Sequence, residues 1–304
     1  MSALVEWTPA EGAAVGLRPL VARHRLHELA LFDDAALVAV LERYPREWLQ
    51  AFTMGDDVCR PAEWRLVDVA GLSGAALWDA IERERLWVHL PRVEAVEPRY
   101  RTLLAELTAA VRARCPQLRL RAIPFATLLL SSPGALVYYH ADARHHMLWQ
   151  LRGTKRLWVY PAGDPRFAPP HLMEDVLTGR HEHDGDLPYH PEFDAAATSF
   201  RLSPGDVASW PLHAPHRLVN DPVRNVSLVT PLATPGAARR RDVAAANRFF
   251  RTRLGLPLTS TREVGIGPTL KRLAYRLCRR AGLVPGAPLA SAAPRPPRVA
   301  RRVP

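Results

Sequence analysis

The sequence is poor in cysteine and lysine, two residue types that often carry chemistry. Its three cysteines, Cys59, Cys115 and Cys278, are widely spaced, which argues against a disulfide framework or a cysteine-based zinc site. Free cysteines fit a reducing compartment, so a cytoplasmic location is expected. Arginine supplies nearly all of the 41 basic side chains, and the only lysines are Lys155 and Lys271. Each lysine therefore marks a position where the compact ammonium group itself can matter; for Lys271, chance is the simpler interpretation.

The sequence also lacks a long apolar run. No stretch approaches the roughly 18 residues needed to span a bilayer, and the richest one, residues 126–130, ends at a Ser-Ser-Pro-Gly turn. Residues 1–9 are neither basic nor followed by an apolar segment, so a signal peptide is not expected. With 48% apolar and 23% charged residues, the composition is typical of a globular protein with one large domain or two modest ones.

Acidic residues are scarce toward the C-terminus. Residues 237–304 hold 16 Lys+Arg and 2 Asp+Glu, a balance of +14, whereas the preceding 236 residues hold 25 and 28, a balance of −3. The near-neutral body argues against a basic nucleic-acid-binding core. The basic C-terminal part could instead contact an anionic surface, and its helices could form a homodimer.

Apolar spacing predicts a mostly helical region over residues 1–115 that packs on the core. The expected helices cover residues 33–52, 73–85 and about 98–114. Short strand-like segments divided by Gly, Pro and Asn then follow. They lie at residues 118–130, 135–140, 147–151, 156–160, 200–202, 206–210 and 226–231. Many short strands at close spacing predict a β-sandwich or barrel over residues 116–235.

Three further segments complete the expected organisation. Residues 161–199 are polar and rich in proline, which predicts a surface insert in the barrel with some helix. Residues 236–284 are rich in alanine and arginine and predict a basic helical region with an apolar stripe near residues 270–278. Residues 285–304 have the Pro/Ala/Arg composition of a disordered tail.

The segment Tyr-Tyr-His-Ala-Asp at residues 138–142 is the first candidate for chemistry. On a strand, residues i and i+2 project to the same face, so His140 and Asp142 can point together into a barrel. An imidazole and a carboxylate are two of the three ligands of a facial triad, which leaves positions open on iron(II) for a co-substrate and O2. A His-x-Asp pair alone is weak evidence, because it is common by chance.

Two later features strengthen this interpretation. A Pro-Gly-Asp turn at residues 204–206 leads into a strand expected to end in Pro-His at 215–216, and such a strand can bring His216 back as a third ligand. Lys155 follows His140 by fifteen residues. A buried lysine at this place can pair with the far carboxylate of a dicarboxylate co-substrate.

The segments HADARHHMLWQLRGTKRLWVYP (140–161), PGDVASWPLHAPHRLVN (204–220) and NVSLVTPL (225–232) resemble the JmjC/cupin-like hydroxylases, a family of Fe(II)- and 2-oxoglutarate-dependent oxygenases. The resemblance extends upstream through residues 32–55 and 85–90, and it covers roughly residues 30–235. No single piece is specific, but their combination and order are. Family members often carry Asn where this chain has His146, so contacts from that position are not carried over.

The resemblance implies a mainly β fold with flanking helices, in which a double-stranded β-helix (a jelly-roll, cupin-like core) lies between N-terminal and C-terminal helical regions. It implies a 2-oxoglutarate-dependent dioxygenase that uses O2 to hydroxylate an unactivated C–H bond of a protein side chain, a peptide or another small molecule. It also implies that 2-oxoglutarate chelates the iron and places its far carboxylate on Lys155, with Tyr138 and Ser227 as further candidates for co-substrate contacts. The implied iron(II) ligands are His140, Asp142 and His216.

Other histidines compete for these roles. His213 lies three residues before His216, so the two cannot both face inward on a regular strand, and the proline before His216 favours His216 as the ligand. His145 and His146 are expected beside the site or at the surface rather than on the metal. The remaining candidates, for which a solvated loop is expected rather than a zinc site, are His171, His181, His183 and His190.

Two other functions stay open at this point. A metal-dependent cupin enzyme that works without 2-oxoglutarate would keep the barrel and the metal, but Lys155 argues against it. A non-catalytic cupin-like binding or regulatory module is the other alternative, and the intact set of ligand residues argues against that. Metal content together with succinate release would separate the three.

Overall fold

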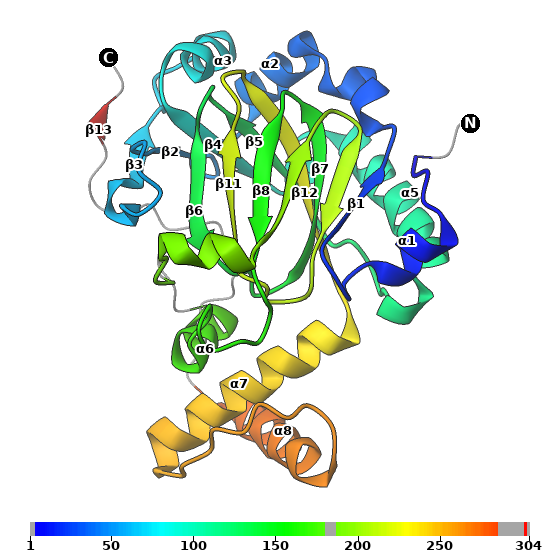
Figure 1. Cartoon of the computed structure of the whole chain (residues 1–304), viewed down its shortest axis with the longest axis vertical. Coiled ribbons are helices and arrows are strands. Elements are labelled where there is room, and N and C mark those ends of the chain that lie inside the picture. Colours follow the sequence, from blue (N-terminus) through cyan, green and yellow to red (C-terminus); the bar gives the residue numbers. More distant parts are fainter. Residues whose placement is uncertain (1–3, 180–186, 285–300, 303–304) are drawn as a thin grey trace.

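The computed structural model describes residues 4–179, 187–284 and 301–302. Two β-sheets face each other at its centre (Figure 1). The large sheet has the strand order β1-β10-β7-β12-β5-β4-β2-β3-β13, and the small sheet has the order β6-β11-β8-β9. The strands are β1 Leu20–Arg23, β2 Gln50–Thr53, β3 Arg65–Asp68, β4 Leu86–Pro91, β5 Thr127–Ser131, β6 Leu136–His140, β7 His145–Arg152, β8 Lys155–Val159, β9 Thr198–Leu202, β10 Asp206–Ser209, β11 His216–Asn220, β12 Asn225–Leu232 and β13 Arg301–Arg302.

Strands β5 to β12 form the barrel. β5, β7, β10 and β12 belong to the large sheet, and β6, β8, β9 and β11 belong to the small sheet. The chain thus changes sheet at almost every connection, and the paired strands are antiparallel. Eight antiparallel strands wound in this way form a jelly roll, or double-stranded β-helix. The expected fold class is confirmed.

The first 115 residues differ from the mostly helical region expected, because they also contribute four strands to the large sheet. Helix α2 (Asp34–Arg43) is followed by β2 at Gln50, so the helix predicted over residues 33–52 is too long. Pro45 explains the early end, since proline cannot continue a helix and disfavours helical backbone in the residue before it. β2 and β4 pair with each other, and β4 pairs with β5, so this region extends the barrel's own sheet.

Two of the predicted strands also differ from the structure. The strand expected over residues 118–130 is confined to β5, because Pro124 interrupts the earlier part. The strand expected to end at His216 is also wrong in detail: β10 ends at Ser209, and His216 instead begins β11. The remaining predicted strands occur within two residues of their expected bounds.

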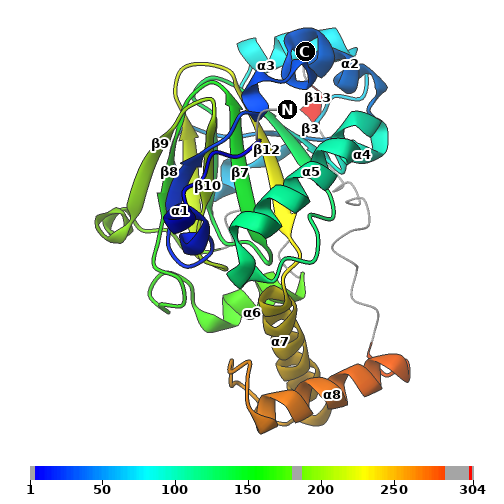
Figure 2. The ribbon, with the colours of Figure 1, turned by 90° about the vertical axis from the view of Figure 1, so that its right-hand side faces the viewer.

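Helices cover the large sheet on the side away from the small sheet (Figures 1 and 2). The main core lies between them: Leu37, Ile81 and Leu107 on the helices pack with Leu128 and Leu228 on the sheet in one buried cluster. The helices are α1 Pro9–Ala14, α2, α3 Gly74–Arg83, α4 Val93–Val96, α5 Pro98–Arg114, α6 Pro170–Thr178, α7 Pro235–Leu254 and α8 Ile266–Arg280. Short 3₁₀ turns lie at Leu26–Glu28, Ala30–Phe32, Pro61–Glu63, Pro116–Leu118 and Pro191–Ala196.

The insert between β8 and β9 carries α6 and the 3₁₀ turn at Pro191–Ala196. It is held to the small sheet by the buried Arg217, which pairs with Asp194 and lies 3.6 Å above the centre of the Trp158 ring. Tyr160 adds a hydrogen bond from its hydroxyl to Asp194 at 2.6 Å. The insert therefore packs against the outer face of the barrel.

The C-terminal helices project from the opposite end of the barrel to α2 and α3 (Figure 1). α7 pairs with α6 through Arg248–Asp175 and Arg251–Glu174, and α8 packs on α7. In the described part of the chain, no helix combines the length and the apolar character needed to cross a membrane. The tail expected to be disordered, residues 285–304, falls outside the described residues apart from 301–302.

Candidate metal centre

Three sequence-predicted ligands come together at one end of the small sheet. His140 ends β6 and His216 begins β11, and the two are direct partners in the antiparallel register. Their ring centres are 4.2 Å apart. Asp142 follows β6 by two residues, and one ligand atom from each of the three side chains lies within 4.8 Å of the others. The sequence alone could place His140 and Asp142 on one face; the pairing of β6 with β11 adds His216.

Hydrogen bonds to the backbone orient both imidazoles. The Nδ1 atom of His140 lies 2.7 Å from the carbonyl oxygen of Tyr138, and the Nδ1 atom of His216 lies 3.1 Å from that of Ala214. A carbonyl oxygen only accepts, so in each ring Nδ1 carries the proton and Nε2 keeps its lone pair. This is the tautomer that a metal-binding histidine needs, with the second ring nitrogen held by an outer partner.

The charges of the trio also suit a divalent cation. Burial lowers the pKa of His216 to about 3, so this imidazole is neutral at physiological pH. Burial alone would raise the pKa of Asp142, but the imidazoles of His146, His216 and His140 outweigh it and hold the pKa well below its usual range. The trio therefore offers two imidazole nitrogens and one anionic oxygen, the donor set of a facial triad on non-haem iron(II).

His146 contacts the site through Asp142. Its Nδ1 atom lies 2.8 Å from Asp142 Oδ2, an oxygen that is also 3.5 Å from His216 Nε2. Sequence reasoning had left His146 either beside the site or at the surface. The structure places it beside the carboxylate, where it can hold one oxygen in a fixed direction.

The neighbouring histidines lie elsewhere. His145 faces the other side of β7 and is buried, with Nε2 3.3 Å from Ser209 Oγ. His213 has a left-handed backbone (φ 67°) in the turn before β11 and is not part of the trio. His171 and His190 are exposed, while His181 and His183 lie outside the described residues.

Lys155 is buried inside the barrel, with 4% of its surface exposed. Its Nζ atom donates to Ser227 Oγ at 2.9 Å, and this bond connects β8 of the small sheet with β12 of the large sheet. No carboxylate among the described residues lies within ion-pair distance of it. Burial lowers the pKa of Lys155 from 10.5 to about 7. A buried ammonium group without an acidic partner is costly, and an anionic ligand that paired with it would offset this cost.

Gln150 and Asn225 extend this polar network, and sequence reasoning missed both. Ser227 donates to Gln150 Oε1 at 2.8 Å, and Gln150 Nε2 donates to Asn225 Oδ1 at 2.7 Å. Gln150 Nε2 also lies 3.0 Å from the carbonyl oxygen of Gly153, in the turn that precedes Lys155. Gln150 lies four residues after His146, on the same face of β7, and this spacing could have pointed to it. Only the register shows that Gln150 stands opposite Ser227.

The register also relates Lys155 to the trio. His216 stands opposite Val159 on β8, and Lys155 lies four residues from Val159 on the same face. At about 3.3 Å per residue this separates the two backbones by roughly 13 Å. Both side chains are buried.

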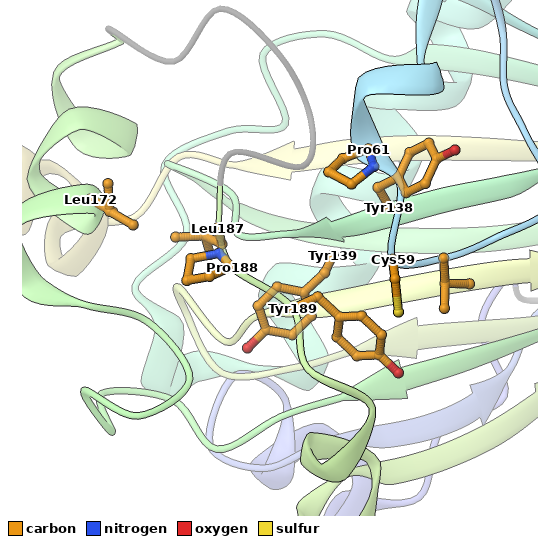
Figure 3. Close-up of a pocket in the computed structure, with 9 residues that line it drawn as sticks. Cys59, Pro61, Tyr138, Tyr139, Leu172, Leu187, Pro188 and Tyr189 are labelled. Carbon is orange, nitrogen blue, oxygen red and sulfur yellow. The ribbon is translucent and has the colours of Figure 1, made fainter.

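A pocket of about 430 Å³ adjoins β6 just before His140. It is lined by Tyr138 and Tyr139 of β6, by the segment Val58–Pro61, by Leu172 of α6 and by residues 187–189 (Figure 3). Its lining is aromatic, aliphatic and prolyl apart from the thiol of Cys59, and it contains no Asp, Glu, Lys or Arg. Tyr138, a weaker candidate for the co-substrate, packs against Trp64 with ring centres 6.0 Å apart and belongs to this pocket.

No family model and no curated sequence matches this chain. A solved structure of Escherichia coli YcfD matches over 91% of this chain and 68% of that one, with 16% identity and a TM-score of 0.53. The chain shares this fold. A second structure, described as the Escherichia coli ribosomal oxygenase YcfD in complex with cobalt and 2-oxoglutarate, has 14% identity and a TM-score of 0.48 over 86% of this chain and 62% of that one. The chain thus spans about two thirds of the length of both structures.

Proposed function

We propose that this protein is an Fe(II)- and 2-oxoglutarate-dependent oxygenase that hydroxylates an unactivated C–H bond of a protein side chain or a small molecule. The observation that carries the proposal is the pairing, in one barrel, of a His-Asp-His trio with a buried lysine that has no acidic partner among the residues the structure describes. The trio alone would suit many divalent metal sites. Lys155 adds a reason to expect an anionic co-substrate beside the metal.

In this proposal, His140, Asp142 and His216 hold the iron on one side and leave its other side open. Iron(II) with 2-oxoglutarate bound supplies the activation of O2 for C–H hydroxylation. Lys155 would bind the far carboxylate, and Ser227 orients the ammonium group by accepting a hydrogen bond from it. The protein's own contribution is to fix these groups in a closed barrel and to keep water away from them.

The pocket beside β6 is the proposed place for part of the substrate. Its uncharged lining of Tyr139, Tyr189 and Pro188 favours an apolar or aromatic group over an ionic one. Tyr138 and Tyr139, which line the pocket, directly precede His140 on β6, so a group bound there would lie against the strand that carries this ligand residue.

A cupin enzyme that works without 2-oxoglutarate is the second candidate, and it rests on the trio alone. It gives no role to the buried ammonium group of Lys155, which would then destabilise the folded protein and bind no ligand. The first proposal is therefore preferred.

Release of succinate tests the proposal. The purified protein should convert 2-oxoglutarate to succinate in air when iron(II) is added, slowly without substrate and faster with one. Asp142→Ala should lose this activity. Metal binding without consumption of 2-oxoglutarate would favour the second candidate, and a protein that binds no metal would be a non-catalytic module.

A further inference from the structure

One row of side chains crosses the large sheet on the face that looks toward the small sheet. Gln50 of β2 stands opposite His89 of β4. His89 in turn stands opposite Leu129 of β5, whose other partner is Ser227 of β12. Direct partners on antiparallel strands share a face of the sheet. Ser227 accepts the hydrogen bond from Lys155 of the small sheet, so His89 and Gln50 also face the space between the two sheets.

The neighbours of His89 along β4 agree with this direction. Val88 and Leu90 are buried in the main core beneath the helices, and side chains alternate along a strand, so His89 points to the opposite face. Trp87, two residues before His89, lies in one buried cluster with Leu136 of the small sheet. His89 therefore belongs to the inner face of the fold.

Two contacts fix the imidazole of His89. Its Nδ1 atom lies 3.1 Å from Oε1 of Gln50, and its ring stacks on Trp87 with ring centres 5.3 Å apart. The amide oxygen only accepts, so Nδ1 carries the proton and Nε2 keeps its lone pair. Among the described residues, neither His89 Nε2 nor the amide nitrogen of Gln50 has a hydrogen-bond partner, and both side chains are partly exposed. The pair thus offers one acceptor beside one donor to a ligand.

The charge around His89 selects the class of ligand. Burial, and to a smaller extent the imidazole of His146, lowers the pKa of His89 to about 4, so the ring is neutral at pH 7 and gives an anion no positive charge. No carboxylate in the described part of the chain forms an ion pair with His89, so a cation finds no negative charge there. A neutral amide fits best, because it carries its donor and its acceptor on two separate atoms.

We propose that His89 and Gln50 form a subsite for a neutral amide group of the substrate. The N–H group of this amide donates to His89 Nε2, and its carbonyl oxygen accepts from the amide nitrogen of Gln50. Two strand spacings of about 4.8 Å separate His89 from Ser227, so the bound amide lies beside the position proposed for the co-substrate. The inference rests on the proposed function only in calling the ligand a substrate, because this binding needs no metal.

Ligand-observed NMR on the metal-free protein tests the subsite with two probes of similar shape, phenylacetamide and methyl phenylacetate. The ester keeps the ring and the carbonyl group but has no N–H group. The wild type should bind the amide about tenfold more tightly than the ester, since one hydrogen bond separates the two probes.

Three variants locate this preference. His89→Phe keeps a ring on Trp87 but removes both nitrogens, so it should bind the two probes equally, whereas His89→Gln can still accept and should keep most of the preference. Gln50→Leu should weaken the binding of both probes, because each carbonyl group loses its donor. His171→Phe, at an exposed position of α6, is the matched control and should bind as the wild type does.

Equal binding of the two probes by the wild type would overturn the proposal. The same holds for a preference that survives in His89→Phe, for an equal loss of both probes in that variant, and for unchanged binding in Gln50→Leu. Thermal unfolding shows whether each variant folds. Succinate release with iron(II) keeps the two proposals apart: an amide preference without succinate would contradict the proposed function alone, and succinate without the preference would contradict this subsite alone.

Discussion

Replacing Lys155 with methionine should make the protein more stable and its co-substrate binding weaker. Methionine keeps the length of the side chain but removes the buried charge. Burial lowers the lysine pKa from 10.5 to about 7, and at about 1.4 kcal/mol per pKa unit the charged form costs the folded state on the order of 4 kcal/mol at neutral pH. Ser227 loses a hydrogen bond worth about 1 kcal/mol, so a net gain of about 2–4 kcal/mol is expected.

The pH dependence follows from the sign of the shift. Between pH 7 and 10.5 the unfolded chain holds a proton on Lys155 that the folded chain has lost, so this group makes the wild type more stable as pH rises through that window. The advantage of Lys155→Met should therefore be full below pH 7 and vanish near pH 10.5. Urea unfolding of the metal-free protein at several pH values measures this.

Binding should change in the opposite direction. Loss of the ammonium group should weaken 2-oxoglutarate binding by about 3 kcal/mol, or roughly a hundredfold. Wild-type affinity should also fall about tenfold per pH unit above pH 7, because Lys155 must take up a proton to bind the carboxylate. Lys271→Met is the control, since Lys271 is tied to Asn247 far from the barrel, and it should leave binding unchanged. A Lys155→Met protein that is less stable yet binds 2-oxoglutarate normally would refute this reasoning.

Three further predictions concern single contacts. Asp142→Asn should abolish iron binding, measured by metal content after desalting, while the thermal unfolding of the metal-free protein stays cooperative. His146→Leu should weaken iron binding about 10- to 100-fold by freeing the Asp142 carboxylate, whereas His146→Asn, which can still donate a hydrogen bond, should keep most of it; equal losses would show that the hydrogen bond is unimportant. Arg217→Ala should remove the charged partner of Asp194, leaving it the hydrogen bonds from Tyr160 and Tyr189, and should increase proteolysis of the insert while iron binding persists; an unchanged cleavage rate would mean that other contacts hold the insert.

The candidate site was predictable where it depended on local spacing. The two-residue spacing singled out His140 and Asp142, although β6 ends at His140 and Asp142 lies in the connection that follows, not on the strand. The rarity of lysine singled out Lys155. Ser227 was named from family resemblance, and its bond to Lys155 now supplies a physical reason for it. The contact between His146 and Asp142 was not predictable, because it depends on how the chain turns between β6 and β7.

The strands of the barrel could be predicted from the sequence more closely than the elements that precede the barrel in the chain. β8 (Lys155–Val159) has clear boundaries because Gly153 precedes it and Pro161 follows it. β2 is only Gln50–Thr53, and its apolar residues continue the helical pattern of α2, so local sequence could not separate the two. Its strand conformation depends on pairing with β3 and β4, which are distant in the sequence.

Anaerobic titration with iron(II) and then 2-oxoglutarate tests the central claim most directly. The account predicts a weak visible charge-transfer band when 2-oxoglutarate joins the iron, with saturation at one equivalent of metal and loss of the band in Asp142→Asn. Iron binding without the band would contradict the role of 2-oxoglutarate, and a band that survives in Asp142→Asn would contradict the ligand assignment.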